Sequence, residues 1–431
     1  MIFLIVKTIF FIYLNKIQLI NILIKVIILK IKVCRSCKNL SLTKVYSLGK
    51  QTLTGIFPSK KNAKITKGDL SMVICKKCKL LQLEHNFDAN EMYGENYGYM
   101  SSLNKTMVLH LKMKTLNLRN KYNLKSKDLI LDIGSNDGTF LSFFNNKFKL
   151  FGCDPTIKKF NNLYRKDINQ LPVFFSSKHF KDKKFKLVTS ISMFYDLPDP
   201  LDFAQQIHSI LHNKGIWHIE LSYMPMMIKN TSYDTICHEH LEYYSLKSLK
   251  YLLDSANLKI INLSFNQING GSIELDIAKK KSSFKECKHL INWVLESERL
   301  HKYNEIGKQK NFFKECQNHK FLLKKLLVTL KKQNKKILGY GASTKGNVLL
   351  QYCNIDSKLI NYIAEVNKFK FNKFTPGTNI KIVSEKEAKL KKPDYLLVLP
   401  WHFKDHIIKR EQKFLKDGGK LIFPLPDIEI V

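Results

Sequence analysis

Two pairs of closely spaced cysteines constrain the fold of this chain more than any other feature. Cys34 and Cys37 form one Cys-x-x-Cys pair, and Cys75 and Cys78 form a second, with 37 residues between the pairs. Two such pairs let four thiolates converge on one Zn²⁺ in a tetrahedral arrangement. A redox pair or unrelated thiols are the alternative. Because cysteine fills all four positions, we expect a structural zinc ion rather than a catalytic one.

A second pattern, from residue 129 to residue 154, predicts a nucleotide-binding α/β domain. An apolar strand runs into a turn that contains Gly134 and Gly138, and a further strand over 148–153 ends at Asp154. A strand, a glycine turn, a helix and a strand that ends in an acid form the ribose-binding half of a doubly wound fold. An ordinary βα turn with a surface acid is the alternative.

The chemistry of this turn favours S-adenosylmethionine (SAM) over a dinucleotide. The turn has only two glycines, and Asp132 and Asp137 lie where a pyrophosphate would have to bind. These carboxylates repel phosphate and favour a cation, and SAM combines a ribose with a sulfonium centre and no phosphate. Further strands over 171–175, 186–192 and 215–221, with a hairpin over 259–278, predict a parallel sheet finished by an antiparallel pair.

A polar segment between the fifth strand and the hairpin, residues 233–245, combines groups suited to proton transfer. It contains Cys237, His238, Glu239 and His240 in sequence, together with three tyrosines. It follows the carboxyl end of a strand, where ligands and catalytic groups gather in α/β sheets. Histidine is a suitable base near neutral pH, and a neighbouring carboxylate can orient it. A metal site at the two histidines, which lacks a clear third ligand, and a structural role are the alternatives.

A Lys-rich helical stretch over about 282–334 leads to a second α/β unit. Its strand-to-helix turn contains Gly339, Gly341, Lys345 and Gly346. The amides of such a turn, together with a lysine, could bind phosphate. We therefore interpret this unit as binding a phosphate-bearing substrate rather than a second SAM.

The formal charge of +36 does not by itself indicate a nucleic-acid-binding protein. Only five of the 72 basic residues are arginine, and the lysines are spread along the chain. Base readout and phosphate forks favour arginine. We expect no nucleic-acid partner, and a zinc-containing nucleic-acid-binding protein is kept as a less favoured hypothesis. An oxidoreductase with two nucleotide-type domains is disfavoured by the acids of the first turn.

Residues 1–33 are apolar but are interrupted by Lys7, Lys16 and Lys25. No uncharged run reaches the roughly 20 residues that a membrane-spanning helix needs, and no secretory cleavage pattern follows. An amphipathic segment at a membrane surface fits this pattern. We favour an extension outside the folded domains, such as one translated from an incorrect upstream start. We expect a cytoplasmic protein without stable membrane insertion, as a monomer or small homo-oligomer.

These segments, in this order, resemble the sugar C-methyltransferase family. The matching segments are the two cysteine pairs, 131–138, 238–240, 270–272, 339–347 and 376–377. The resemblance implies an α/β fold: a class I methyltransferase (Rossmann-like) sheet with an N-terminal zinc-binding module and a C-terminal Rossmann-like domain. It divides the chain into the extension (1–33), a zinc-binding domain (34–95), a SAM-dependent methyltransferase domain (96–282) and linking helices with a C-terminal substrate domain (283–431).

Characterised members of that family act on nucleotide-linked 4-keto-deoxysugars, whose ketone acidifies the C3 proton. The resemblance implies that His240 removes this proton, that Glu239 supports the site, and that the enolate carbon attacks the SAM methyl group. Tyr243 and Cys237 are the other predicted catalytic residues. The predicted SAM contacts are Tyr97, Tyr99, Asp132, Gly134, Asn136, Asp137, Gly138 and Asp154. The predicted substrate contacts are Tyr233, His238, Gly341, Lys345 and Asn347.

Two positions depart from the family pattern. Cys237 stands where the family often has a tyrosine that would stabilise the enolate, and Asp196 stands where it often has a histidine. A thiol is a poorer hydrogen-bond donor than a phenol, so Tyr233 or Tyr243 is expected to substitute for it. An O- or N-methyltransferase that acts on a related sugar or small metabolite is therefore the alternative function.

Overall fold

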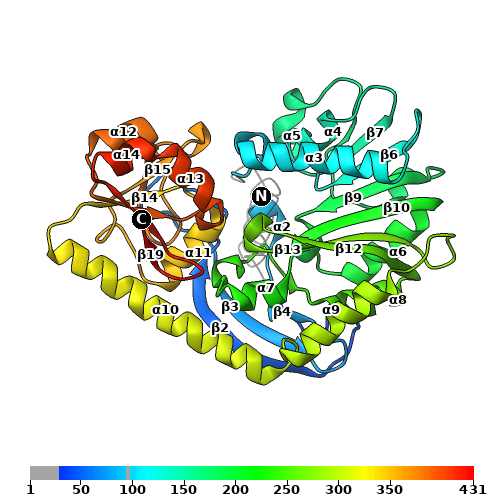
Figure 1. Cartoon of the computed structure of the whole chain (residues 1–431), viewed down its shortest axis with the longest axis horizontal. Coiled ribbons are helices and arrows are strands. Elements are labelled where there is room, and N and C mark those ends of the chain that lie inside the picture. Colours follow the sequence, from blue (N-terminus) through cyan, green and yellow to red (C-terminus); the bar gives the residue numbers. More distant parts are fainter. Residues whose placement is uncertain (1–28, 94–97) are drawn as a thin grey trace, which may run out of the picture.

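The computed structural model describes residues 29–93 and 98–431, which form seven-, six- and four-stranded sheets, a two-stranded ribbon and the surrounding helices (Figure 1). Residues 1–28 of the predicted extension, and Tyr97, lie outside the described residues. Leu29–Lys30, which the sequence analysis places in that extension, instead form strand β1 and pair with β5 (His85–Asn86). Within the described segments, no helix is long and apolar enough to cross a bilayer.

The central sheet consists, as predicted, of five parallel strands followed by an antiparallel hairpin. In spatial order its strands are β12 (Leu258–Asn266), β13 (Ser272–Lys279), β10 (Leu211–Ser222), β9 (Phe185–Ile191), β6 (Leu129–Ile133), β7 (Lys149–Cys153) and β8 (Asn169–Leu171). The third strand in the sequence, β8, ends at Leu171, the first residue of the predicted strand over 171–175, because Pro172 lacks the N–H that would continue the ladder.

Helices lie on both sides of this sheet (Figure 1). On one side are α3 (Lys105–Lys121), α4 (Thr139–Ser142) and α5 (Ile157–Phe160). On the other are α6 (Pro200–Ile210) and α8 (Leu246–Ser255). Two short helices, α2 (Ala89–Tyr93) and α7 (Met224–Lys229), lead into the central domain and into the 233–245 insert.

The zinc-binding module is built mainly of strands, which the sequence analysis did not predict. Its sheet contains β2 (Leu42–Thr52), β3 (Lys67–Cys75), β4 (Leu81–Leu83) and β11 (Glu242–Tyr243). The strand β11 comes from the central domain's insert and pairs antiparallel with β4, with Glu242 opposite Gln82 and Tyr243 opposite Leu81. The insert that carries His240 is therefore joined to the zinc-binding module by a shared sheet.

Two helices, α9 (Lys288–Leu300) and α10 (Ile306–Lys332), connect the central domain to the C-terminal domain along one side of the molecule (Figure 1). The C-terminal sheet has the order β16 (Lys381–Ser384), β15 (Tyr362–Glu365), β14 (Ile337–Tyr340), β17 (Tyr395–Val398), β18 (Lys420–Phe423) and β19 (Glu429–Ile430). Its helices are α11 (Thr344–Tyr352), α12 (Glu385–Leu390), α13 (Lys404–Arg410) and α14 (Gln412–Lys416).

One hydrophobic cluster draws residues from the zinc-binding sheet, the insert and the C-terminal domain. Helix α10 packs on β2, where the ring of Tyr46 stacks on Phe313 at 5.5 Å and meets Phe312 edge-on at 5.8 Å. Because burial of apolar surface is the dominant favourable term in folding, this shared cluster fixes the three modules against one another.

Arg35 fixes the junction between the zinc-binding module and the insert. Its guanidinium donates to Leu83 O at 2.6 Å, to His85 O at 2.9 Å and to Asn86 Oδ1 at 2.6 Å. It also forms a buried ion pair with Glu242 of β11, at 3.6 Å between Nε and Oε1. A buried carboxylate is tolerated when a cation balances its charge, so Arg35 stabilises β11 in this position.

Replacing Arg35 should therefore destabilise the whole fold. We expect Arg35→Ala to lower the free energy of unfolding by about 3–5 kcal/mol, because Glu242 is left buried without its cation. Urea unfolding followed by circular dichroism measures this change. The matched control is Arg299→Ala, whose partner Glu296 is solvent-exposed, so its effect should be small. Equal stability of the two variants would contradict this role for Arg35.

Candidate active site

The four predicted cysteine ligands converge on one point. Cys34 Sγ lies 3.5 Å from Cys78 Sγ, Cys37 Sγ lies 3.5 Å from Cys75 Sγ, and all four sulfurs lie within 4.8 Å of one another. A tetrahedron with Zn–S bonds of about 2.3 Å separates its sulfurs by about 3.8 Å, so this set fits zinc. The two Cys-x-x-Cys turns have the same backbone geometry, because the lysine after each pair, Lys38 and Lys79, has a positive φ in the left-handed region.

The glycine turn of the central domain is built as the sequence predicts. Gly134 has a φ of 76° and donates to Cys153 O at 2.9 Å. Asp154 accepts from the backbone N–H of Asn136 at 2.9 Å and from Thr156 N at 2.7 Å. The turn and the acid thus lie together at the carboxyl edge of the sheet, where class I methyltransferases bind SAM.

The other predicted SAM contacts surround this turn. Asn136 accepts from Ser101 N at 3.1 Å and donates to Tyr99 O at 3.3 Å, so the segment before α3 lies over the turn. Asp137 accepts from Ser102 N at 2.9 Å. Gly138 has a φ of 76°, and its N–H donates to Ser135 O at 2.9 Å.

Asp132 lies deeper than the sequence analysis expects. It is 4 % exposed and accepts a hydrogen bond from Thr189 Oγ1 at 2.6 Å, between β6 and β9. Burial raises the pKa of its carboxyl to about 7. Asp132 therefore stabilises the sheet beneath the turn, and its role as a SAM contact stays a prediction.

The imidazole of His240 is arranged to act as a base. Its Nδ1 lies 2.7 Å from Thr235 O. A carbonyl can only accept, so Nδ1 carries the proton and Nε2 keeps its lone pair. Burial and, second, the nearby Lys345 ammonium lower the pKa of His240 to about 3. The ring is thus neutral at ordinary pH, and the Tyr195 ring contacts it at 4.4 Å.

Glu239 contacts the zinc-binding module rather than His240. Its Oε2 accepts from Thr54 Oγ1 at 3.2 Å. Gly55 passes so close that a Cβ there would lie 2.4 Å from Glu239 Oε1. Burial raises the pKa of Glu239. No sequence signal pointed to the loop at 54–55, which folds against the insert from almost 200 residues away.

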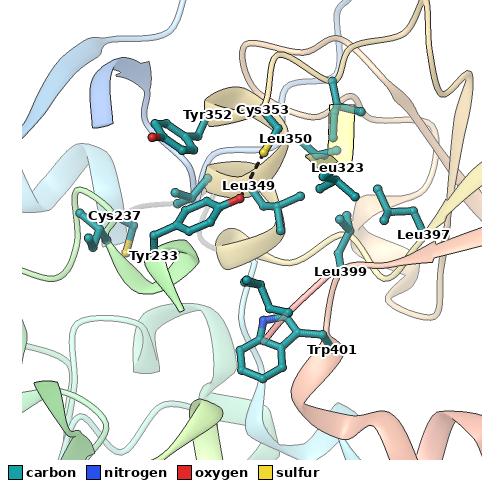
Figure 2. Packing of buried hydrophobic residues seen from close by; sticks show 14 of the residues in the cluster. Tyr233, Cys237, Leu323, Leu349, Leu350, Tyr352, Cys353, Leu397, Leu399 and Trp401 are labelled. Atoms are coloured by element: carbon teal, nitrogen blue, oxygen red, sulfur yellow. Dashed lines mark hydrogen bonds between the residues drawn. The ribbon is translucent and has the colours of Figure 1, made fainter. Parts of the chain in front are cut away.

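Two predicted substrate contacts of the insert lie in packed surroundings, and their role as substrate contacts stays a prediction. His238 is fully buried against the zinc-binding module, with its ring edge-on to Phe87 at 4.7 Å. Tyr233 points into the C-terminal domain, where its hydroxyl lies 2.9 Å from His319 Nδ1 and 3.1 Å from Cys353 Sγ (Figure 2). Through these contacts both residues hold the insert against its neighbouring modules.

The two positions that depart from the family pattern, Cys237 and Asp196, lie among buried residues. Cys237 is fully buried, and the hydroxyl of Tyr243 donates to Thr235 O at 3.4 Å, the carbonyl that also holds His240. The substitution of Tyr233 or Tyr243 for the missing phenol stays a prediction. Burial raises the pKa of Asp196 well above its ordinary value. Burial thus favours the protonated form of Asp196, which can donate a hydrogen bond.

The C-terminal turn brings Lys345 to the insert. Its Nζ donates to Asn269 O at 2.7 Å, in the turn between β12 and β13. Nearby, Trp401 Nε1 donates to Asp234 Oδ2 at 2.8 Å, a contact that the sequence analysis missed. Asn347 is fully buried and donates to Thr54 O at 2.7 Å. Asn347 thus positions the loop beside Glu239, and its role as a substrate contact stays a prediction.

Another cluster of metal-ligating side chains, His110, Glu220 and Glu274, lies beside the central sheet. The Lys114 ammonium lies 2.7 Å from Glu220 Oε2 and 2.9 Å from Glu274 Oε1. Because this ammonium balances the carboxylates, the cluster is an internal ion-pair network.

The fold and the glycine turn define a class I SAM-dependent methyltransferase. Three family models match consecutive parts of the chain: a zinc binding domain at residues 34–93, a methyltransferase domain at 109–263 and a C-methyltransferase C-terminal domain at 267–426. The chain therefore has, in order, domains similar to those of C-methyltransferases. It uses SAM and has a structural zinc site.

Among curated proteins, the C-methyltransferase NovU of Streptomyces niveus is 27% identical over 406 residues, which cover 92% of this chain and 96% of NovU. Solved structures with similarity to about 40% of this chain include a SAM-dependent methyltransferase from Clostridium acetobutylicum, with 12% identity, 92% of that chain covered and a TM-score of 0.34. Another is the plantazolicin methyltransferase BpumL in complex with a pentazolic desmethylPZN analog and SAH, with 14% identity, 84% covered and a TM-score of 0.33.

Loss of the metal should loosen the active-site insert as well as the zinc-binding module. We expect Cys75→Ser to release zinc and to lower the unfolding midpoint, because structural metal binding is coupled to folding. Metal content by atomic absorption and thermal unfolding measure both effects. Cys287→Ser is the control, since Cys287 lies outside the cluster. Full zinc content in Cys75→Ser would contradict the assignment.

Proposed function

We propose that this enzyme C-methylates a nucleotide-linked keto-deoxysugar, with His240 as the general base. The observation that carries this proposal is the His240 ring, held neutral with its Nε2 lone pair free by the bond from Nδ1 to Thr235 O. The similarity to the C-methyltransferase NovU supports carbon as the methylated atom.

The proposed reaction begins with a ketone that acidifies the proton on the neighbouring carbon. His240 Nε2 takes this proton, and the C–H electron pair becomes the enolate. When bound, SAM supplies an electrophilic methyl group, and the carbon–methyl bond forms as the methyl–sulfur bond breaks to leave S-adenosylhomocysteine. Proton transfer to a positioned side chain contributes about 10²- to 10⁴-fold in rate.

Two further groups complete the proposed site. Asp196, whose pKa is raised by burial and by the nearby Glu239 charge, is our candidate donor to the enolate oxygen. Tyr99, Gly134, Asn136, Asp137, Gly138 and Asp154 are the proposed SAM contacts. Glu239, held by Thr54, supports the position of the neighbouring His240. We further propose that the enzyme acts in the cytoplasm on a small-molecule substrate, without a nucleic-acid partner.

The test of this proposal separates deprotonation from methyl transfer. In D₂O with S-adenosylhomocysteine bound, we expect the wild-type enzyme to exchange the α-proton of a nucleotide 4-keto-6-deoxysugar, as NMR would show. His240→Gln should lose this exchange and about 10²- to 10⁴-fold of turnover, with SAM affinity within twofold of wild type.

The control variant is His179→Gln, because His179 is exposed on the far edge of the central domain's fold. It should behave as the wild type in both assays. Retained exchange in His240→Gln would show that another group is the base. Methylation without any exchange, even in the wild type, would favour the alternative of O- or N-methylation.

A further inference from the structure

The segment that leads into α3 lies over the glycine turn of the central domain. Ser101 N donates to Asn136 Oδ1 at 3.1 Å, and Ser102 N donates to Asp137 Oδ2 at 2.9 Å. Both acceptors belong to residues that we propose as SAM contacts. We call residues 98–104 the cover segment, because these bonds hold it against the turn.

The C-terminal domain holds the first residue of the cover segment through Asn367. The Nδ2 of Asn367 donates to Gly98 O at 3.1 Å. The other end of the same amide, Oδ1, accepts from Phe369 N at 3.0 Å and caps the 3₁₀ turn over Lys368–Lys370. The backbone N–H of Asn367 donates to Glu365 Oε1 at 2.9 Å. Because its own domain fixes this buried side chain, Asn367 presents its Nδ2 donor at a defined position.

Gly98 is also enclosed by a contact between two modules. A Cβ at Gly98 would lie 3.0 Å from Lys370 Cε and 3.5 Å from Phe57 Cδ2. The Lys370 ammonium lies 4.4 Å from the centroid of the Phe57 ring and donates to Ala342 O at 2.8 Å. A cation is attracted to the face of an aromatic ring, so this pair closes around the Gly98 backbone. The C-terminal domain and the zinc-binding module therefore hold the start of the cover segment together.

A continuous line of hydrogen bonds runs from Asn367 to the acid that follows β7. Asn367 bonds to Gly98 O, and the next carbonyl along the chain, Tyr99 O, accepts from Asn136 Nδ2 at 3.3 Å. The backbone N–H of Asn136 in turn donates to Asp154 Oδ2 at 2.9 Å. The position of Tyr99 relative to the glycine turn thus depends on a bond from another domain.

We infer that Asn367 is a positioning residue for SAM binding, which fixes the cover segment from the C-terminal domain and keeps Tyr99 against the glycine turn. This inference rests on the proposed SAM contacts Tyr99, Asn136 and Asp154. When the cover segment is not held, the arrangement that binds SAM is a smaller fraction of the population. The apparent affinity for SAM falls by that fraction. SAM binding in the central domain therefore depends on the docking of the C-terminal domain.

The variant Asn367→Asp removes the interdomain bond with a minimal change of shape. Aspartate keeps the oxygen that caps the 3₁₀ turn, and it replaces the Nδ2 donor by an oxygen that repels Gly98 O. In the full-length protein, we expect the KM for SAM and the Kd for S-adenosylhomocysteine to rise about three- to tenfold, the usual effect of one lost hydrogen bond. The kcat at saturating SAM should stay within twofold. Calorimetry and steady-state kinetics with a nucleotide 4-keto-6-deoxysugar measure these constants.

The matched control is Asn379→Asp, which adds the same charge to the C-terminal domain at a different contact with the zinc-binding module. Asn379 Oδ1 accepts from Asn62 N at 2.9 Å, and aspartate can accept the same bond. Its affinity for S-adenosylhomocysteine should stay within twofold of the wild type. An equal loss of affinity in the two variants would overturn the inference. Asn367→Ala, which removes the donor without adding a charge, should weaken binding in the same direction as Asn367→Asp.

A double-mutant cycle separates positioning from a general loosening of the fold. In a Tyr99→Ala background, Asn367→Asp should weaken S-adenosylhomocysteine little further, because it acts through Tyr99. An undiminished further loss would overturn the inference. Asp154→Asn tests the proposed SAM contacts directly. If it weakens binding and Asn367→Asp does not, the role of Asn367 fails and the SAM contacts stand. If neither variant weakens binding, the proposed SAM contacts and this inference both fail.

Discussion

The pairing of β4 with β11 is the interaction on which the arrangement of the active site depends. The zinc-binding cysteines fix the start of this interaction, because Cys75 ends β3 and Cys78 lies three residues before β4. Gln82 of β4 donates to Cys34 Sγ at 3.3 Å and lies opposite Glu242 of β11. His240 is two residues before β11. A metal site more than 150 residues away in the sequence thus sets the position of the proposed base.

The other modules complete this arrangement from two sides. The loop at Thr54 holds Glu239 and is itself held by Asn347 of α11. The insert also extends into the C-terminal core through Tyr233, which bonds to Cys353 and His319 (Figure 2). Because every module contributes to the surroundings of the insert, the site exists only when all three are folded together. This explains why the proposed catalytic segment carries so many buried polar groups.

The sequence predicted the parts of the fold that local chemistry dictates. Some features can be predicted because their residue spacing is typical of one local structure. These features are the glycine turn with Asp154, the four cysteines, the hairpin at Asn269 and the second glycine turn. The strands of the zinc-binding module were missed, because their pairing depends on partners distant in the sequence, including β11. The same limit applies to the site. The residue types around His240 pointed to acid–base chemistry, but only the fold shows that His238 and Tyr233 are packed in the core, that Asn347 donates to Thr54 O and that Trp401 donates to Asp234.

The central claim is that this methyltransferase forms a carbon–carbon bond at a position made acidic by a ketone. The most direct test is NMR of the product formed from a nucleotide 4-keto-6-deoxysugar and SAM that carries a ¹³C-labelled methyl group. The account predicts that the labelled methyl is bonded to the ring carbon next to the ketone, with loss of that carbon's proton. A labelled methyl on oxygen or nitrogen would contradict it.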